Sequence, residues 1–223
     1  MSDHHDPELL LQLFLHLGYS QHRAQPMLVL APPVIEVPSY SEATADTVTP
    51  GGAAQLRPLR WHLDARGALC ELHRTTWAGR PIDPAHRSGG SVGQVYTSTT
   101  RPGVVKGWHV HSQQTDRFIC VRGAVLVALC DLRPLLHAPL GIAGPLPDSR
   151  VDTVVLDSSR GLAQLTIPPG VVHGWRALDH NDGESWVLNV CSSLYDGTDE
   201  YRIPPRRQPA PGAFFDWWAP IDG

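Results

Sequence analysis

The chain has 223 residues, a formal net charge of −4 and a sequence pI of about 6.3. Hydrophobic residues make up 42% of it and charged residues 18%, a balance typical of a folded globular protein and not of a disordered chain. Because no basic excess is present, the composition gives no electrostatic reason to expect nucleic acid or an anionic membrane as a partner. The length suits one domain with extensions.

The four cysteines stand far apart, each in an apolar, strand-like segment, at Cys70, Cys120, Cys130 and Cys191. This spacing favours reduced, buried thiols, with a disulfide between neighbouring strands as the alternative. No apolar run approaches the roughly 20 residues that span a bilayer. The acidic, histidine-rich N-terminus also lacks the basic flank of a secretory signal. We therefore expect a cytoplasmic protein without a membrane partner.

Residues 6–18 are the one clear helix candidate. Asp6 suits the N-cap, Pro7 the first helical position and Gly18 the position after the C-cap. A narrow polar stripe recurs every four residues, and leucines with one phenylalanine cover the rest of the surface. A helix this apolar must be covered, so we expect it to pack on the barrel or on a second subunit.

Beyond the helix, residues 24–60 carry several prolines and few charges, which predicts an extended arm with one strand at Met27–Leu30. From Trp61 onward, short apolar strands alternate with turn residues, a pattern typical of a β-sandwich or barrel. The aromatic segment at 214–218 must cover an apolar surface, either the barrel wall or a partner. The predicted division is a helix with an extended arm, a barrel and an aromatic tail, at residues 1–55, 56–205 and 206–223.

Three histidines and one carboxylate stand out within the predicted barrel. His109 and His111 are two residues apart, so on a β-strand both point to the same face. Asp116 follows closely, and His173 comes after a Pro-Pro-Gly turn that ends the strand at 162–167. Histidines on separate strands converge only if the sheet closes on itself. The sequence therefore predicts a pocket inside a barrel.

The spacing resembles the two motifs of the cupin superfamily, HxHxxxxE and PxGxxH. The first motif is present with Asp116 in place of glutamate, and the second is complete at Pro168, Gly170 and His173. The resemblance implies an all-β fold, a cupin jelly-roll β-barrel to which the short N-terminal helix and the extended arm are attached.

Four segments in chain order further resemble the dTDP-4-dehydrorhamnose 3,5-epimerase family. They match its DxRGxxxE, RGxH, DxR and IPxGxxHGF motifs at Asp64–Glu71, Lys106–His109, Asp131–Arg133 and Ile167–Trp175. The resemblance implies a homodimer that acts on a nucleotide-linked 4-keto deoxysugar without a metal or an organic cofactor. In that chemistry a histidine removes the proton alpha to the ketone, a cation stabilises the enolate, and a tyrosine returns the proton on the opposite face.

Carried over by position, His109 falls on the catalytic base and His173 on the second pocket histidine. A histidine suits the base because its pKa lies near neutrality. The resemblance also implies substrate contacts at Arg66, Glu71, Lys106, Trp108 and Arg133. A structural salt bridge is the alternative for Arg66 and Arg133, and core packing is the alternative for Trp108.

The sequence departs from the family pattern at three positions. Asp116 falls where the family has its enolate-stabilising lysine, and segment 185–191, in which the tyrosine is expected near Leu188, contains none. Asp216 is a candidate by position only for the late aspartate that orients the base. These departures favour a single epimerisation or a ketoisomerisation over the full double epimerisation.

The same residues permit another interpretation. His109, His111, Asp116 and His173 form a mixed nitrogen and oxygen set that suits a divalent transition metal such as Fe, Mn, Ni, Co or Zn. Alternatively, His111 and Asp116 hydrogen-bond to each other in a polar pocket. The competing hypotheses for function are a metal-dependent cupin enzyme that acts on another small molecule and a sugar-binding cupin without catalytic activity.

Overall fold

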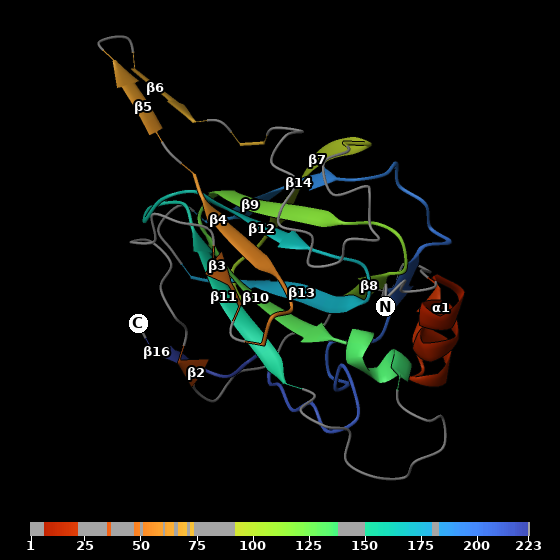
Figure 1. Ribbon diagram of the computed structural model, residues 1–223. Coiled ribbons are helices and arrows are strands. Elements are labelled where there is room, and N and C mark those ends of the chain that lie inside the picture. The colour runs from red at the N-terminus through yellow and green to blue at the C-terminus, as the bar shows by residue number, and fades with distance from the viewer. Residues whose placement is uncertain are drawn as a thin grey trace.

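The computed structural model describes residues 7–21, 35–36, 47–49, 51–59, 61–64, 67–70, 72–73, 92–137, 150–179 and 183–222. The predicted substrate contacts Arg66 and Glu71, the N-cap Asp6 and the predicted strand Met27–Leu30 lie outside these residues. Within them, two antiparallel sheets form the cupin jelly roll that the motifs predict (Figure 1).

The strands of the jelly roll divide between two six-stranded sheets. The first sheet has the order β1-β15-β8-β13-β10-β11, formed by Ser20–Gln21, Glu200–Arg202, Val105–His111, Val171–Ala177, Ala124–Asp131 and Val151–Asp157. The second has the order β3-β4-β12-β9-β14-β7, formed by Thr47–Val48, Gln55–Pro58, Ala163–Ile167, Asp116–Arg122, Ser185–Cys191 and Gln94–Thr100.

The remaining elements are short. β16 (Ile221–Asp222) pairs in parallel with β2 (Ile35–Glu36), while β5 (Trp61–Asp64) and β6 (Gly67–Cys70) form a hairpin. The helix α1 (Pro7–His16) confirms the predicted helix, and η2 (Arg133–His137) is a single 3-10 turn. No helix in the described part of the chain has the length and apolar character needed to cross a membrane.

The first sheet is buried on both of its faces, as β10 shows most clearly. Alternate side chains of a strand point to opposite faces, so Val125, Val127 and Leu129 pack between the two sheets. Leu126 and Cys130 point the other way, toward α1 and the C-terminal tail. This explains why β10 reads as an uninterrupted apolar run and not as an alternating one.

The outer layer confirms the expectation that the apolar helix and the aromatic tail are covered by the barrel wall. Leu10 and Phe14 of α1 have no exposed surface, and both belong to the outer core cluster. Trp217 of the tail is also fully buried, with its ring 4.5 Å from that of Trp108 on β8. Figure 1 shows α1 beside the barrel and not inside it.

The predicted division into arm, barrel and tail stays a prediction, and two features of the structure bear on it. β3 lies within residues 1–55, yet it pairs with β4 in the second sheet, and Leu56 of β4 is fully buried opposite Leu165. The segment is rich in proline and glycine, as loops are, so its composition does not predict β3 and β4. The hairpin β5–β6, inside the predicted barrel range, instead forms its own two-stranded sheet that projects away from the barrel (Figure 1).

None of the four cysteines forms a disulfide in the described part of the chain. Cys120, Cys130 and Cys191 are buried, and burial raises the pKa of each to about 12. These three groups therefore stay in the unreactive thiol form, as their isolated positions predict.

Two glycines bring β8 and β13 unusually close together beside the pocket. A Cβ on Gly174 would lie 2.7 Å from the Cα of Gly107 and 2.8 Å from the carbonyl oxygen of Lys106. His109 and His173 are direct partners across these strands, and their ring centroids are 4.0 Å apart. The glycine pair thus permits the contact between the two imidazoles.

We expect Gly174→Ala to reduce the free energy of unfolding by about 1–3 kcal/mol, the usual range for overpacking a close contact. Chemical denaturation measures this loss. Gly197→Ala is the control, because its nearest neighbour is the hydroxyl of the exposed Tyr195 at 3.3 Å. Equal stability of the two variants would contradict the close approach of β8 and β13.

Candidate functional site

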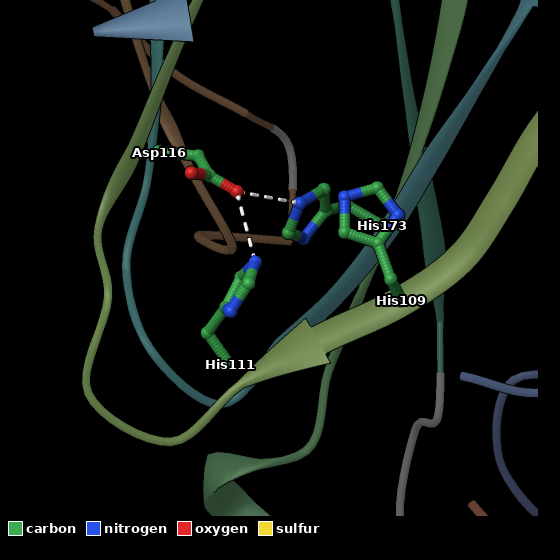
Figure 2. Close-up of side chains that lie close together, drawn as sticks. All are labelled: His109, His111, Asp116 and His173. Carbon is green, nitrogen blue, oxygen red and sulfur yellow. Dashed lines mark hydrogen bonds and ion pairs between the residues drawn. The ribbon is translucent and has the colours of Figure 1, made fainter. Parts of the chain in front are cut away.

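Three histidines and Asp116 converge in the hollow between the sheets, as the sequence predicts. His109 and His111 lie on β8, His173 on the neighbouring β13, and Asp116 at the start of β9 in the other sheet. Each residue offers one ligating atom, and these four atoms lie within 4.8 Å of one another. Figure 2 shows Asp116 facing both His111 and His173, with His109 beside His173.

Asp116 is held by polar side chains on both of its carboxylate oxygens. Oδ1 accepts hydrogen bonds from Gln114 Nε2 at 2.8 Å and from Asn189 Nδ2 at 2.9 Å. Oδ2 lies 3.1 Å from His173 Nε2 and 3.4 Å from His111 Nε2. Burial alone would raise the pKa of Asp116, but the two histidines outweigh it and hold this pKa well below the ordinary value. Asp116 is therefore the buried anion of the cluster.

His111 is the cation that faces this anion. Its Nδ1 lies 2.9 Å from the carbonyl oxygen of Asp199, which can only accept, so Nδ1 carries a proton. Its Nε2 faces the carboxylate of Asp116 and is protonated for the same reason. Burial alone would lower the pKa of His111, but Asp116, Asp199 and Glu200 raise it to about 9. At neutral pH the ring is an imidazolium.

His173 is fixed in the same manner as His111. Its Nδ1 lies 2.9 Å from the carbonyl oxygen of Val171, and its Nε2 faces Asp116. Both ring nitrogens therefore have protein partners, which leaves the ring no freedom to turn toward a ligand. His173 therefore helps to hold the Asp116 carboxylate in place, and it is not available to take a proton from a substrate.

His109 differs from the other two histidines. Within the described residues its ring makes no hydrogen bond to the protein, and it remains partly exposed while the other three members of the cluster are buried. Burial and the neighbouring His173 and His111 lower its pKa well below the ordinary value. At neutral pH His109 is thus a neutral imidazole with an unengaged nitrogen, the state that a general base requires.

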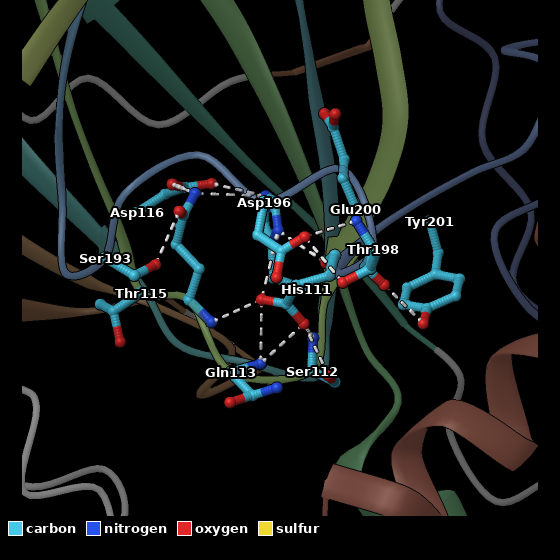
Figure 3. Close-up of polar contacts among 12 residues, drawn as sticks. His111, Ser112, Gln113, Thr115, Asp116, Ser193, Asp196, Thr198, Glu200 and Tyr201 are labelled. Carbon is cyan, nitrogen blue, oxygen red and sulfur yellow. Dashed lines mark hydrogen bonds and ion pairs between the residues drawn. The ribbon is translucent and has the colours of Figure 1, made fainter. Parts of the chain in front are cut away.

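The loop between β8 and β9 is held in place by Asp199. Its carboxylate accepts hydrogen bonds from the backbone N–H groups of Ser112, Gln113 and Gln114 at 2.8, 3.1 and 3.0 Å, and from the Ser112 hydroxyl. Figure 3 shows Ser112 and Gln113 of this loop beside His111. Because the loop joins His111 to Asp116, Asp199 fixes the distance between the cation and the anion.

Of the late aspartates, Asp199 lies beside His111 and not at the predicted base His109, so an aspartate that orients the base stays a prediction. The positional candidate Asp216 accepts a hydrogen bond from the backbone N–H of Trp218 in the tail, at 2.9 Å. Asp199 is the carboxylate beside the histidines, with Oδ2 3.8 Å from His111 Nδ1. Sequence position alone did not reveal this, since the order of motifs says nothing about which turn reaches the pocket.

A cavity of about 310 Å³ opens beside the cluster. His111 and Gln114 line one part of it, Glu200 and Arg202 of β15 another, and Gln94 and Tyr96 of β7 belong to the opposite sheet. Tyr96, Glu200 and Arg202 are not among the site residues that the sequence predicts. The alternation Glu200-Tyr201-Arg202, two charged residues around a buried tyrosine, is a signal that could have indicated the last two.

Tyr96 places a phenol in the pocket although β14 has none. Its hydroxyl accepts a hydrogen bond from Asn189 Nδ2 at 3.1 Å, so its own proton is not used in that contact. Burial, and then the negative charge of Asp116, raise the pKa of Tyr96. The group is therefore a protonated phenol at neutral pH.

The other predicted substrate contacts have structural partners. Lys106 donates to Ser98 Oγ and to the Thr99 carbonyl oxygen, both at 2.6 Å. Trp108 lies in the outer core, where its Nε1 donates to the carbonyl oxygen of Arg207 at 3.0 Å, which corresponds to the packing alternative.

Arg133 is buried and forms two hydrogen bonds with the carboxylate of Asp131, at 2.8 and 2.6 Å. This ion pair corresponds to the salt-bridge alternative for Arg133. A substrate role for Lys106, Trp108 and Arg133 stays a prediction.

Comparison with known proteins agrees with this geometry. A family model described as the polysaccharide biosynthesis C-terminal domain matches residues 62–138. A probable low-salt glycan biosynthesis epimerase of Haloferax volcanii is 33% identical over 172 residues, which cover 76% of this chain and 96% of the relative. A spore coat polysaccharide biosynthesis protein of Bacillus subtilis is 28% identical over 150 residues, 67% of this chain and 87% of the relative.

Similar solved structures are also sugar isomerases and epimerases. A dTDP sugar isomerase from Desulfovibrio desulfuricans has a TM-score of 0.55 and 27% identity, and the match covers 76% of this chain and 92% of that one. The rmlC epimerase of Mycobacterium tuberculosis has a TM-score of 0.58 and 25% identity, over 80% and 84% of the two chains.

The jelly roll and the polar cluster in its hollow define a cupin. The chain belongs to the dTDP-4-dehydrorhamnose 3,5-epimerase-like family of cupins, as a divergent member, and its role is that of a sugar epimerase-like protein. The structure from Desulfovibrio desulfuricans is described as a dTDP sugar isomerase. Epimerases of this family act without a cofactor, in agreement with the chemistry that the resemblance implies.

Proposed function

We propose that the protein is an epimerase or isomerase of a nucleotide-linked 4-keto deoxysugar of the dTDP type, with His109 as the general base. The observation that carries the proposal is the difference among the three histidines. His111 and His173 are engaged at both ring nitrogens, while His109 is neutral and unengaged. The similar structure described as a dTDP sugar isomerase supports the choice of a dTDP-linked substrate.

The reaction begins when His109 takes the proton from the carbon alpha to the ketone and leaves an enolate. The enolate oxygen needs positive charge in a site with little water. The imidazolium of His111 supplies that charge in place of the missing lysine, because Asp116 holds it protonated. Tyr96, on a strand of the opposite sheet, gives a proton to the other face of the same carbon, and the phenolate then recovers a proton from solvent.

Solvent-deuterium exchange tests this proposal. The protein is incubated with dTDP-4-keto-6-deoxyglucose in D₂O, and the sugar is followed by proton NMR. We expect the NMR signal of a proton alpha to the ketone to disappear. Exchange at C3 indicates epimerisation at C3, and exchange at C5 indicates epimerisation at C5. Absence of exchange above the His109→Ala background would exclude this substrate and this base.

A metal-dependent enzyme is the second candidate, and one observation favours it. The Nδ1 atoms of His111 and His173 both face backbone carbonyls, which is the arrangement that orients histidines for metal binding through Nε2. The Oδ2 atom of Asp116 faces the same centre. His109, His111, Asp116 and His173 thus fit a divalent transition metal, which when bound would polarise a carbonyl oxygen as a Lewis acid.

Metal removal distinguishes the two candidates. For the favoured proposal, we expect exhaustive EDTA treatment to leave the rate of deuterium exchange unchanged within about twofold. Elemental analysis of the protein before and after treatment, with Asp116→Asn as the matched variant, shows whether a metal was removed. Stoichiometric metal that disappears in Asp116→Asn, together with lost exchange, would establish the metal-dependent alternative instead.

We also propose a cytoplasmic homodimer. The exposed side chains of Val95 and Trp186 lie on β7 and β14, the last two strands at one edge of the second sheet in the described part. An apolar sheet edge of this kind favours association with a second copy. Light scattering is expected to give about twice the chain mass of 24.4 kDa. The free thiols support a reducing compartment.

A further inference from the structure

Strand β15 places two opposite charges directly beside the catalytic histidines. Glu200 is the register partner of His111, and Arg202 is the register partner of His109. Residues directly opposite each other in an antiparallel pair point to the same face. Both charged side chains therefore line the cavity, while Tyr201 between them points into the outer core.

Only one of the two carboxylate oxygens of Glu200 has a hydrogen-bond partner among the described residues. Its Oε1 accepts from Arg202 Nη2 at 2.5 Å and from Nε at 3.1 Å. Its Oε2 is buried and has no hydrogen-bond partner among the described residues, although the side chain is only 8% exposed. Buried acceptors in native proteins are almost always paired, because leaving one unpaired is costly. The unpaired oxygen therefore indicates a partner that the chain itself does not provide.

The surrounding charges define the chemistry of that partner. Arg202 already balances the negative charge of Glu200, so the pair offers little net attraction to a second cation. A phosphate is disfavoured, because it has no proton to donate to a carboxylate at neutral pH. The N–H groups of His111 are directed to Asp116 and to the carbonyl of Asp199. A neutral donor fits best, and a sugar hydroxyl is such a donor.

We propose that Glu200 is the specificity-determining residue of the sugar subsite and accepts a hydrogen bond from one ring hydroxyl of the substrate. Arg202 is a positioning residue, which holds Oε1 so that Oε2 remains available. The inference rests on the proposed function for the identity of the ligand as a nucleotide sugar. It adds Glu200, opposite His111, as the residue that distinguishes one sugar from another.

Calorimetric titration with dTDP-glucose, with its ring-deoxy analogues and with dTDP alone tests the subsite. We expect wild-type protein to bind dTDP-glucose about 10-fold or more tightly than one of the deoxy analogues, the effect of one hydrogen bond to a charged group. In Glu200→Ala this difference should fall below about twofold, while the affinity for dTDP stays unchanged. Glu200→Gln preserves the shape of the side chain and should show a partial loss.

Glu184→Ala is the matched control, since Glu184 is half exposed and its ion pair with Arg101 spans 4.0 Å. This variant should retain the wild-type discrimination. Discrimination that persists in Glu200→Ala, or wild-type protein that binds every analogue equally, overturns the subsite even if deuterium exchange is observed. Discrimination that depends on Glu200 without any exchange supports the subsite and overturns the proposed epimerase.

Discussion

Replacing His109 with glutamine is expected to lower the rate of deuterium exchange into the 4-keto sugar by about 10³-fold or more. General-base catalysis by a positioned side chain typically contributes 10²- to 10⁴-fold. His111 and His173 cannot take over the role, because each has protein partners at both ring nitrogens. The fold should survive, since the ring of His109 makes no hydrogen bond in the described part of the protein and is partly exposed.

The measurement is the initial rate of exchange by proton NMR, with a thermal melt of each variant to show that it is folded. His16→Gln serves as the control, because His16 is an exposed histidine at the end of α1 and remote from the pocket. Retention of more than a tenth of the wild-type rate in His109→Gln would show that another group removes the proton.

The largest loss of stability is expected for Asp199→Ala, at about 3 kcal/mol in the free energy of unfolding. The substitution removes the acceptor of three backbone N–H groups and of the Ser112 hydroxyl. Each hydrogen bond to a charged group contributes about 1.5–3 kcal/mol, and bonds that share one acceptor add incompletely. Because the loop at 112–115 then loses its anchor, exchange should fall as well.

Chemical denaturation measures this change. Asp196→Ala is the control, since Asp196 lies in the same turn but its carboxylate is exposed and accepts from the backbone N–H and hydroxyl of Thr198. A loss below about 1 kcal/mol for Asp199→Ala, or an equal loss in both variants, would contradict the role of Asp199 as the anchor of the β8–β9 loop.

The pocket was predictable from local periodicity together with motif spacing. The two-residue interval between His109 and His111 fixes their common face, and the Pro-Pro-Gly turn fixes the start of β13 and the place of His173. These features depend on residues close together in the sequence.

Features that depend on distant pairing were not predictable. β9 and β10 are adjacent in the chain, yet they belong to different sheets, so Asp116 faces His173 across the hollow. Asp199 and Glu200 approach His111 only because β15 pairs with β8. Similarly, Tyr96 reaches Asn189 through the pairing of β7 with β14. One sequence contains no signal for such registers, since strand patterns define faces and not partners.

Titration of the individual histidines by nitrogen-15 NMR tests the central claim most directly. His109 should remain neutral from pH 8 to below its ordinary pKa, because burial and its two neighbours disfavour the charged ring. His111 should stay protonated on both nitrogens until the pH approaches about 9. A protonated His109 at pH 7, or a His111 that loses its proton below that pH, would contradict the assignment of base and cation.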